Sequence, residues 1–388
     1  MKKVFLVLCL ISLFTGCKSE EKVNVIKGAG MANSSLMVSF NELCKGSVEG
    51  FLGKDENLLI YRKSGSTYSY HIIDTKSGTD TLMFTSDSAY KEYTEISPDG
   101  NKVIINDLLF DRIRREQTHL PDGMDKVPGN TDPQPLPSYM FTKDSELLMI
   151  NPMIYIKKYK KMITSISKDI ELPDLTAIGS LKVLPRQLKC VFTGKSSASS
   201  GMSLYTFDLY SKEFLLVDDN ILDFSISPTE DSIAYIRKNS DEESGHELHI
   251  TGLDDNKKRK IATQGKISGM EWSPNGNWIA YSGGKGQESD VWIVKRDGVL
   301  NEQLTQSMFS TGKLDWSSSG KLLAFTSDAY AKSENQSVSD STVYTVTLNI
   351  DDPENIPKTA GQGPERVLLE KELIKILREE TAAILGKQ

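Results

Sequence analysis

The sequence is poor in the residues from which most catalytic and metal sites are built. Its 388 residues contain four histidines and four cysteines. No Gly-x-Ser-x-Gly segment is present, so the nucleophile elbow of α/β-hydrolases is absent. The only long apolar run covers about eleven residues from Val4 to Phe14, too few to span a bilayer. These absences favour a binding protein, although 53 acidic residues could always supply a catalytic pair.

Two of the four histidines lie close together, at His246 and His249. If the segment 247–250 is a strand, as its position in the chain suggests, residues three apart point to opposite faces and cannot share an ion. His71 lies in a second strand-like segment, where a structural role is the simpler interpretation. The sequence therefore predicts no metal site and no cofactor.

The formal net charge is −7, and it becomes −9 once Lys2 and Lys3 are removed with a signal peptide. An acidic chain without a basic stripe is not typical of nucleic-acid-binding proteins. We therefore expect no nucleic-acid partner.

The N-terminus has the features of an export signal. Lys2 and Lys3 precede the apolar run, which ends in Phe14-Thr-Gly-Cys17. Small residues before a cysteine resemble a bacterial lipobox, in which Cys17 would be diacylated and become the new N-terminus. An ordinary cleaved signal is the alternative. We predict a signal peptide over 1–17, a tether over 18–32, and an outer-membrane lipoprotein of a Gram-negative envelope, periplasmic or surface-exposed.

With Cys9 removed and Cys17 lipidated, Cys44 and Cys190 remain. An oxidising compartment permits a bridge between them. Cys190, however, occupies a core position of a strand. We expect two buried thiols rather than a disulfide.

A repeat of 42 to 46 residues organises the chain. Its clearest copy is Trp272-Ser-Pro-Asn-Gly276 followed by Trp278-Ile-Ala-Tyr281: a strand, a tight turn and a second strand. Copies of decreasing quality place one anchor residue in each repeat, at Gly53, Ser97, Thr142, Leu184, Ser227, Ser273 and Ser317. Periods of this length are typical of propellers and solenoids.

The aligned columns support this register. The residue before each anchor is apolar, and so are those six, seven and eight positions after it. A strand with no polar face must be covered on both sides, as in a propeller whose blades pack against each other. We predict an all-β propeller over 33–350, with seven four-stranded blades, or six if the proline-rich repeat fails to form.

Three regions depart from the repeat. The segment from Ser35 to Phe40 precedes the first copy, and we expect it to be the outer strand of the last blade, which would close the ring. Five prolines between Pro121 and Pro137 predict an incomplete second blade with a long loop over 111–138. Such a loop is either functional or a degenerate blade. If functional, its candidate partner-binding residues are Arg112, Arg114, Arg115, His119 and Asp122.

The C-terminal segment 351–388 reads as a linker followed by an amphipathic helix over 365–385. Pro364 suits its first turn, and Gly386 its end. Its apolar stripe comprises Leu369, Leu373, Ile376, Leu377, Ala383 and Ile384. The stripe predicts packing against the propeller or docking onto a partner protein.

The motif W-S-P-[DN]-G-x-x-[IL]-A-[YF] resembles the WD40-like (PD40) repeat of TolB-type propellers. The resemblance covers roughly 33–350 and implies the fold, not a function, because prolyl oligopeptidases and some polysaccharide lyases contain similar repeats. The separate α/β domain of TolB has no counterpart here, so the Tol-Pal role does not transfer.

Two functional hypotheses follow. The first is a non-catalytic, lipid-anchored propeller that binds an envelope protein or glycan. The second is a propeller-type polysaccharide lyase or glycoside hydrolase with carboxylates in the central funnel. A cluster of two or three acids at the channel mouth would favour the second. The sequence identifies neither the ligand nor the binding face.

Overall fold

The computed structural model describes residues 30–64, 67–86, 94–120, 138–150 and 175–350 with gaps inside these ranges, the longest at 328–340, and helical residues 371, 374–379 and 382. The predicted signal peptide, Cys17, Asp122 and the predicted linker lie outside the described residues, as do Leu369, Leu373, Ala383 and Ile384 of the predicted helix. No helix in the described part of the chain is both long and apolar enough to cross a membrane.

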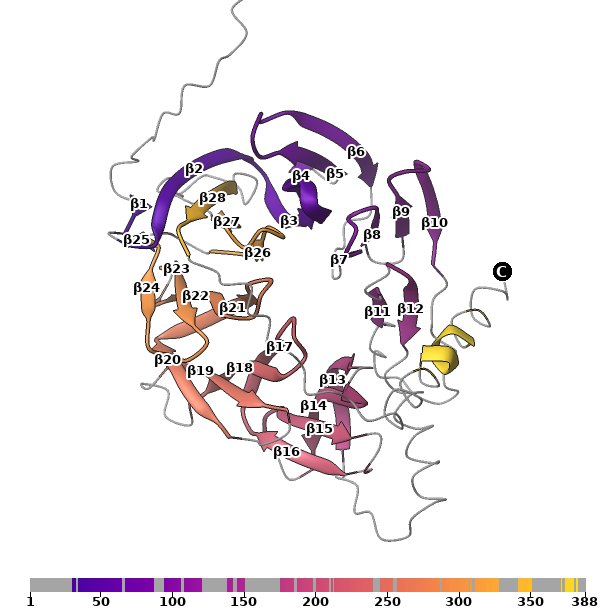
Figure 1. Cartoon of the computed structure of the whole chain (residues 1–388), viewed down its shortest axis with the longest axis vertical. Helices are drawn as coiled ribbons and strands as arrows, with labels where there is room; N and C mark the ends of the chain where they lie inside the picture. Colours follow the sequence, from indigo (N-terminus) through magenta and orange to yellow (C-terminus); the bar gives the residue numbers. More distant parts are fainter. Residues whose placement is uncertain are drawn as a thin grey trace, which may run out of the picture.

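The strands form antiparallel sheets that are arranged in a ring around a common axis, as Figure 1 shows. We number the blades after the seven repeats. Blade 1 comprises β3 (Ser47–Leu52), β4 (Asn57–Ser64), β5 (Thr67–Asp74) and β6 (Asp80–Ser86). In each blade the first strand lies on the inner side of the ring (Figure 1). The all-β propeller is therefore confirmed.

Blade 2 comprises β7 (Thr94–Ile96), β8 (Lys102–Ile105), β9 (Leu108–Asp111) and β10 (Glu116–His119). The prediction that this blade is incomplete is wrong. Its fourth strand pairs with β9 from Glu116↔Asp111 to His119↔Leu108. The strand ends two residues before Pro121, so the prolines begin after the last ladder hydrogen bond rather than within it.

The remaining blades follow in chain order. Blade 3 has β11 (Ser138–Phe141) and β12 (Leu147–Ile150) as its described strands. Blade 4 has β13 (Leu175–Leu184), β14 (Lys189–Ser196), β15 (Ser203–Asp208) and β16 (Phe214–Asp218). Blade 5 has β17 (Ile221–Ile226), β18 (Ser232–Lys238), β19 (His246–Gly252) and β20 (Arg259–Gln264).

Blade 6 has β21 (Lys266–Trp272), β22 (Trp278–Gly284), β23 (Asp290–Lys295) and β24 (Asn301–Gln303). Blade 7 has β26 (Leu314–Trp316), β27 (Leu322–Ser327), β28 (Thr342–Leu348) and, from the other end of the chain, β2 (Met37–Lys45). Six four-stranded sheets are thus present in the described residues. A total of seven four-stranded blades stays a prediction.

The predicted ring closure is confirmed. β2 pairs with β28 from Met37↔Leu348 to Lys45↔Thr342, so the first long strand of the chain completes the last blade. A short pair precedes it: β1 (Gly30–Met31) pairs with β25 (Thr305–Gln306). The fold therefore begins inside the segment predicted as a tether.

The core lies between blades, where the repeat columns predicted it. The residues six positions after the anchors are all buried: Leu59, Val103, Leu148, Cys190, Ile233, Ile279 and Leu323. Cys190 and Cys44 form no disulfide, as expected, but Cys44 is half-buried rather than buried. Each blade thus depends on its neighbours for a dry interface.

The anchor serines explain the turn motif. The Ser273 hydroxyl accepts a hydrogen bond from the Trp278 amide (3.0 Å) and donates one to Asn275 (2.7 Å). The Gly276 amide closes the turn on the Ser273 carbonyl. The turns at Ser97, Ser227 and Ser317 repeat the amide-to-hydroxyl bond. We call the end of the propeller that carries these turns, 97–100, 227–230, 273–276 and 317–320, the turn face.

The C-terminal helix packs against the propeller, as the first of the two predictions stated. Leu377 is fully buried in a cluster with Leu148, Leu181 and Val183 from blades 3 and 4. Arg378 makes a two-pronged ion pair with Glu146, at 2.7 to 2.9 Å. This pair holds the pKa of Glu146 below its usual value. Ile376 is 38% exposed, so that part of the predicted stripe faces away.

Replacing Leu377 by alanine is expected to destabilise the protein by about 2–4 kcal/mol, because it leaves a cavity between two blades and the helix. Ile376→Ala on the same helix turn is the control and should cost well under half as much. Urea unfolding at neutral pH measures both. Equal effects would mean that the helix contributes little to the core.

Candidate functional site

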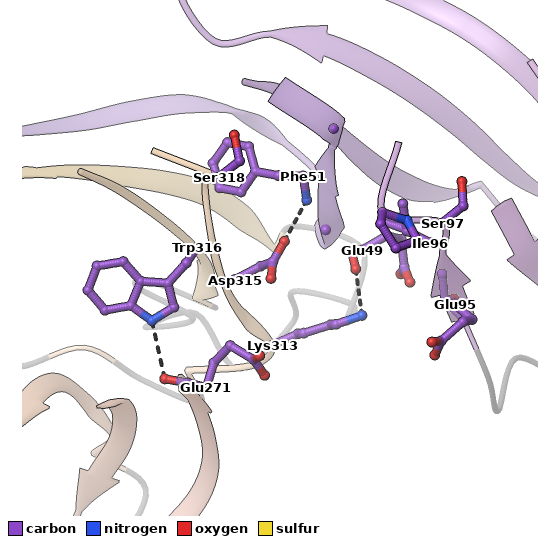
Figure 2. A pocket seen from close by; sticks show the side chains of 14 residues that line it. Glu49, Phe51, Glu95, Ile96, Ser97, Glu271, Lys313, Asp315, Trp316 and Ser318 are labelled. Atoms are coloured by element: carbon purple, nitrogen blue, oxygen red, sulfur yellow. Dashed lines mark hydrogen bonds between the residues drawn. The ribbon is translucent and has the colours of Figure 1, made fainter. Parts of the chain in front are cut away.

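A pocket of about 380 Å³ lies between the inner strands of four blades (Figure 2). Its walls come from the inner strands of blades 1, 2, 6 and 7, namely β3, β7, β21 and β26. Turn residues Gly53, Pro98 and Ser318 also line it, which places it at the turn face.

Four acidic residues and one lysine line this pocket: Glu49, Glu95, Glu271, Asp315 and Lys313. The carboxylate oxygens of Glu49 are themselves buried. Glu95, Glu271 and Asp315 each stand two positions before their anchor residue. Side chains alternate between the two faces of a strand, so these residues lie on the opposite face from the apolar residue just before each anchor. In blades 2, 6 and 7 this opposite face lines the pocket. Lys182 holds the same position in blade 4, and its charge acts on Glu271.

Glu49 reaches the pocket by a different route. The pairing of β3 with β4 has an irregularity between Val48 and Gly50, which inserts Glu49 as an extra residue. Glu49 is 1% exposed, and its carbonyl accepts a hydrogen bond from the Lys313 ammonium group. Figure 2 shows Lys313 extending between the carboxyls of the two sides. The ammonium group thereby ties blade 7 to blade 1.

Hydrogen bonds between neighbouring inner strands fix the Asp315 side chain and the Glu271 backbone. The Phe51 amide donates to Asp315 Oδ2 at 2.5 Å, and the Trp316 indole donates to the Glu271 carbonyl at 3.2 Å. Trp272 makes the same contact with Ser225 of blade 5, at 3.3 Å. The tryptophans before the anchors of blades 6 and 7 thus join the inner strand of each of these two blades to that of the preceding blade.

The pocket changes the acidity of these two carboxyls. Burial, with the charge of Asp315 second, raises the pKa of Glu271 to about 8. Burial also raises the pKa of Asp315 to about 6, although the Phe51 amide and Lys313 oppose this shift. Both side chains are half-buried, so they still touch the open space of the pocket. Glu271 therefore releases its proton at a higher pH than Asp315.

The predicted partner-binding residues do not form one cluster. Arg112 donates to the Gly100 carbonyl and supports the turn of its own blade. Arg114 and Arg115 are exposed beside it at the turn face. His119 is exposed at the far end of β10, opposite Leu108, and therefore lies toward the other face. Asp122 lies outside the described residues.

The histidines have structural contacts. His246 and His249 lie on strand β19, as predicted, and contact different groups: His246 Nδ1 contacts the backbone of Ile267, and His249 Nε2 contacts Glu247 at 2.9 Å. His71 Nδ1 lies 2.7 Å from Asp80. Within the described residues, no group of three or more histidine, cysteine or acidic side chains could hold a metal ion.

No protein-family model matches the sequence. No curated protein matches it either. Solved structures do resemble it. An oligogalacturonate lyase in complex with manganese has a TM-score of 0.55 and 12% identity, over 84% of this chain and 96% of that one. The hydrazine synthase of Kuenenia stuttgartiensis has a TM-score of 0.51 and 12% identity, over 83% and 99%.

A TolB from Agrobacterium tumefaciens also resembles the chain, with a TM-score of 0.43 and 15% identity over 74% of this chain and 89% of that one. The solved structures with similar folds thus include a lyase chain and a synthase chain. At these identities the likeness concerns the fold alone.

Proposed function

We propose that this chain is a lipid-anchored β-propeller of the Gram-negative cell envelope that binds a partner protein or glycan at its turn face. The observation that carries this proposal is the pocket at that face, which acidic residues from four blades line together with Lys313. Converging polar groups in a preformed concave site are typical of ligand recognition. The excess of acids favours a neutral or cationic ligand group over an anionic one.

Arg114 and Arg115 belong to the same proposed surface, because both are exposed at the turn face. The two arginines and the pocket would contact one large partner together. His119, at the far end of β10, would be outside this contact.

Gentle extraction of a tagged full-length protein from its own membranes, followed by mass spectrometry, tests the proposal. We expect a stoichiometric partner with the wild-type chain and its loss with Arg114→Glu/Arg115→Glu or Glu95→Gln. The matched control is His119→Ala, which should retain the partner.

A diacyl modification on Cys17 is expected in the same spectra, and Cys17→Ser should release the protein from the membrane.

A second candidate function is hydrolysis of a glycan in the pocket. It is favoured by Glu271 and Asp315, two carboxyls lining the same pocket whose pKa values are both raised, that of Glu271 further than that of Asp315, as in an acid–base pair. A lyase acting on acidic sugars fits less well, because the pocket would repel a polyuronate. Release of reducing ends from neutral and amino-sugar glycans by wild type, lost in Glu271→Gln, would support hydrolysis. No release from any glycan leaves binding as the function.

A further inference from the structure

The chain enters the propeller along the outer edge of blade 6. Gly30 pairs with Gln306 and Met31 with Thr305, and the Ala32 amide donates to the Leu304 carbonyl at 3.1 Å. Ser34 and Ser35 then donate to the two carboxylate oxygens of Glu302, at 2.5 and 3.0 Å. Figure 1 shows β1 beside β25 at the rim of the ring. Residues 30–35 therefore run antiparallel to 302–306.

The direction of this run is fixed by blade 6. Lys295, at the end of β23, pairs with Trp278, which directly follows the turn 273–276. At the other end of β23, Asp290 accepts a hydrogen bond from the Thr305 hydroxyl at 3.1 Å. Thr305 and its partner Met31 therefore lie at the end away from the turn face. The chain thus enters on the face opposite the turn face and moves toward the turn face by Ser35.

We propose that the anchor holds the propeller with its turn face, and therefore its acidic pocket, directed away from the bilayer. Its partner is then a component of the aqueous compartment and not of the membrane. This inference rests on the lipid anchor at Cys17 proposed above.

The length of the tether is compatible with this arrangement. Thirteen peptide units separate Cys17 from Gly30 and span at most about 45 Å. A blade strand is about 20 Å long. To bring the turn face to the bilayer, the chain would have to return along the rim past the whole height of a blade, which removes many of its conformations. No such restriction applies when the opposite face lies near the bilayer.

Energy transfer to the membrane tests the orientation. A donor dye is attached through a click-reactive amino acid at Val299, 85% exposed in the β23–β24 turn at the turn face, or at Lys285, exposed in the β22–β23 loop on the opposite face. The lipoprotein is placed in phosphatidylethanolamine–phosphatidylglycerol vesicles with a headgroup acceptor. We expect roughly twofold more transfer from position 285 than from 299, given the length of a strand between them. Equal transfer, or more from 299, overturns the proposal.

A second arrangement separates this inference from the anchor itself. If mass spectrometry finds no lipid on Cys17, the mature chain is coupled through Cys17 to a maleimide lipid, with Cys44→Ser to remove the half-buried competing thiol. The same two donors are then compared. More energy transfer from position 285 than from position 299 supports the proposed orientation, even if the natural chain carries no lipid. More transfer from position 299 contradicts it.

Discussion

Gly100→Ala is expected to destabilise the protein by about 3–5 kcal/mol. Gly100 has a φ of +68°, a conformation that L side chains rarely adopt. A Cβ at this position would also lie 2.5 Å from the Gly53 nitrogen and 2.5 Å from the Leu52 carbonyl carbon. Both are backbone atoms of blade 1, so no side chain can rotate away, and the two turns must separate.

Gly276→Ala is the matched control. Gly276 holds the same place in the turn of blade 6, with a φ of +72°, but its nearest neighbour would be 3.6 Å from a Cβ. In this variant the free energy of unfolding should fall only by the strain of an alanine at positive φ, about 1–2 kcal/mol. Urea unfolding of both variants separates strain from collision. If Gly100→Ala costs no more than Gly276→Ala, the turns of blades 1 and 2 are not in backbone contact.

Glu271→Gln is expected to be more stable than wild type at pH 8–9, by an amount on the order of 3 kcal/mol. The folded protein holds a proton on Glu271 up to a pKa of about 8, whereas the unfolded chain releases it near the model value of 4.5. The wild type therefore loses stability as pH rises between these two values. Glutamine keeps the shape of the protonated acid and does not ionise, so the variant lacks this loss.

The difference in unfolding free energy between variant and wild type, measured from pH 5 to pH 9, tests this expectation. It should be near zero at pH 5 and grow with pH.

Asp99→Asn is the control of opposite sign. Hydrogen bonds from Ser97 and Asn101 outweigh the effect of burial and hold the pKa of Asp99 at about 2. That variant should be less stable at neutral pH, with the deficit shrinking as pH falls below about 4. A flat difference for Glu271→Gln would show that its carboxyl is solvated.

The sequence contains a signal for part of the pocket, because Glu95, Glu271 and Asp315 each stand two positions before an anchor. The repeat motif itself concerns the apolar columns and does not include this position. Glu49 could not have been found in this way, because a register irregularity at Val48 brings it to the pocket. For the residues of the loop 111–138, the sequence gives charge and hydrophilicity, and these do not determine the face of the propeller on which a side chain lies.

What the sequence determined is the part of the structure that depends on local periodicity. The repeat spacing, the apolar columns and the turn serines specified a propeller, and the strand-like residues before the first repeat specified its closure. Each of these follows from alternation within a strand or from turn chemistry. What only the tertiary structure decided is which side chains from different blades meet. Three features depend on packing between distant segments, for which no local pattern exists. They are the contact of Leu377 with blades 3 and 4, the completeness of blade 2, and the presence of four acidic residues with Lys313 in one pocket.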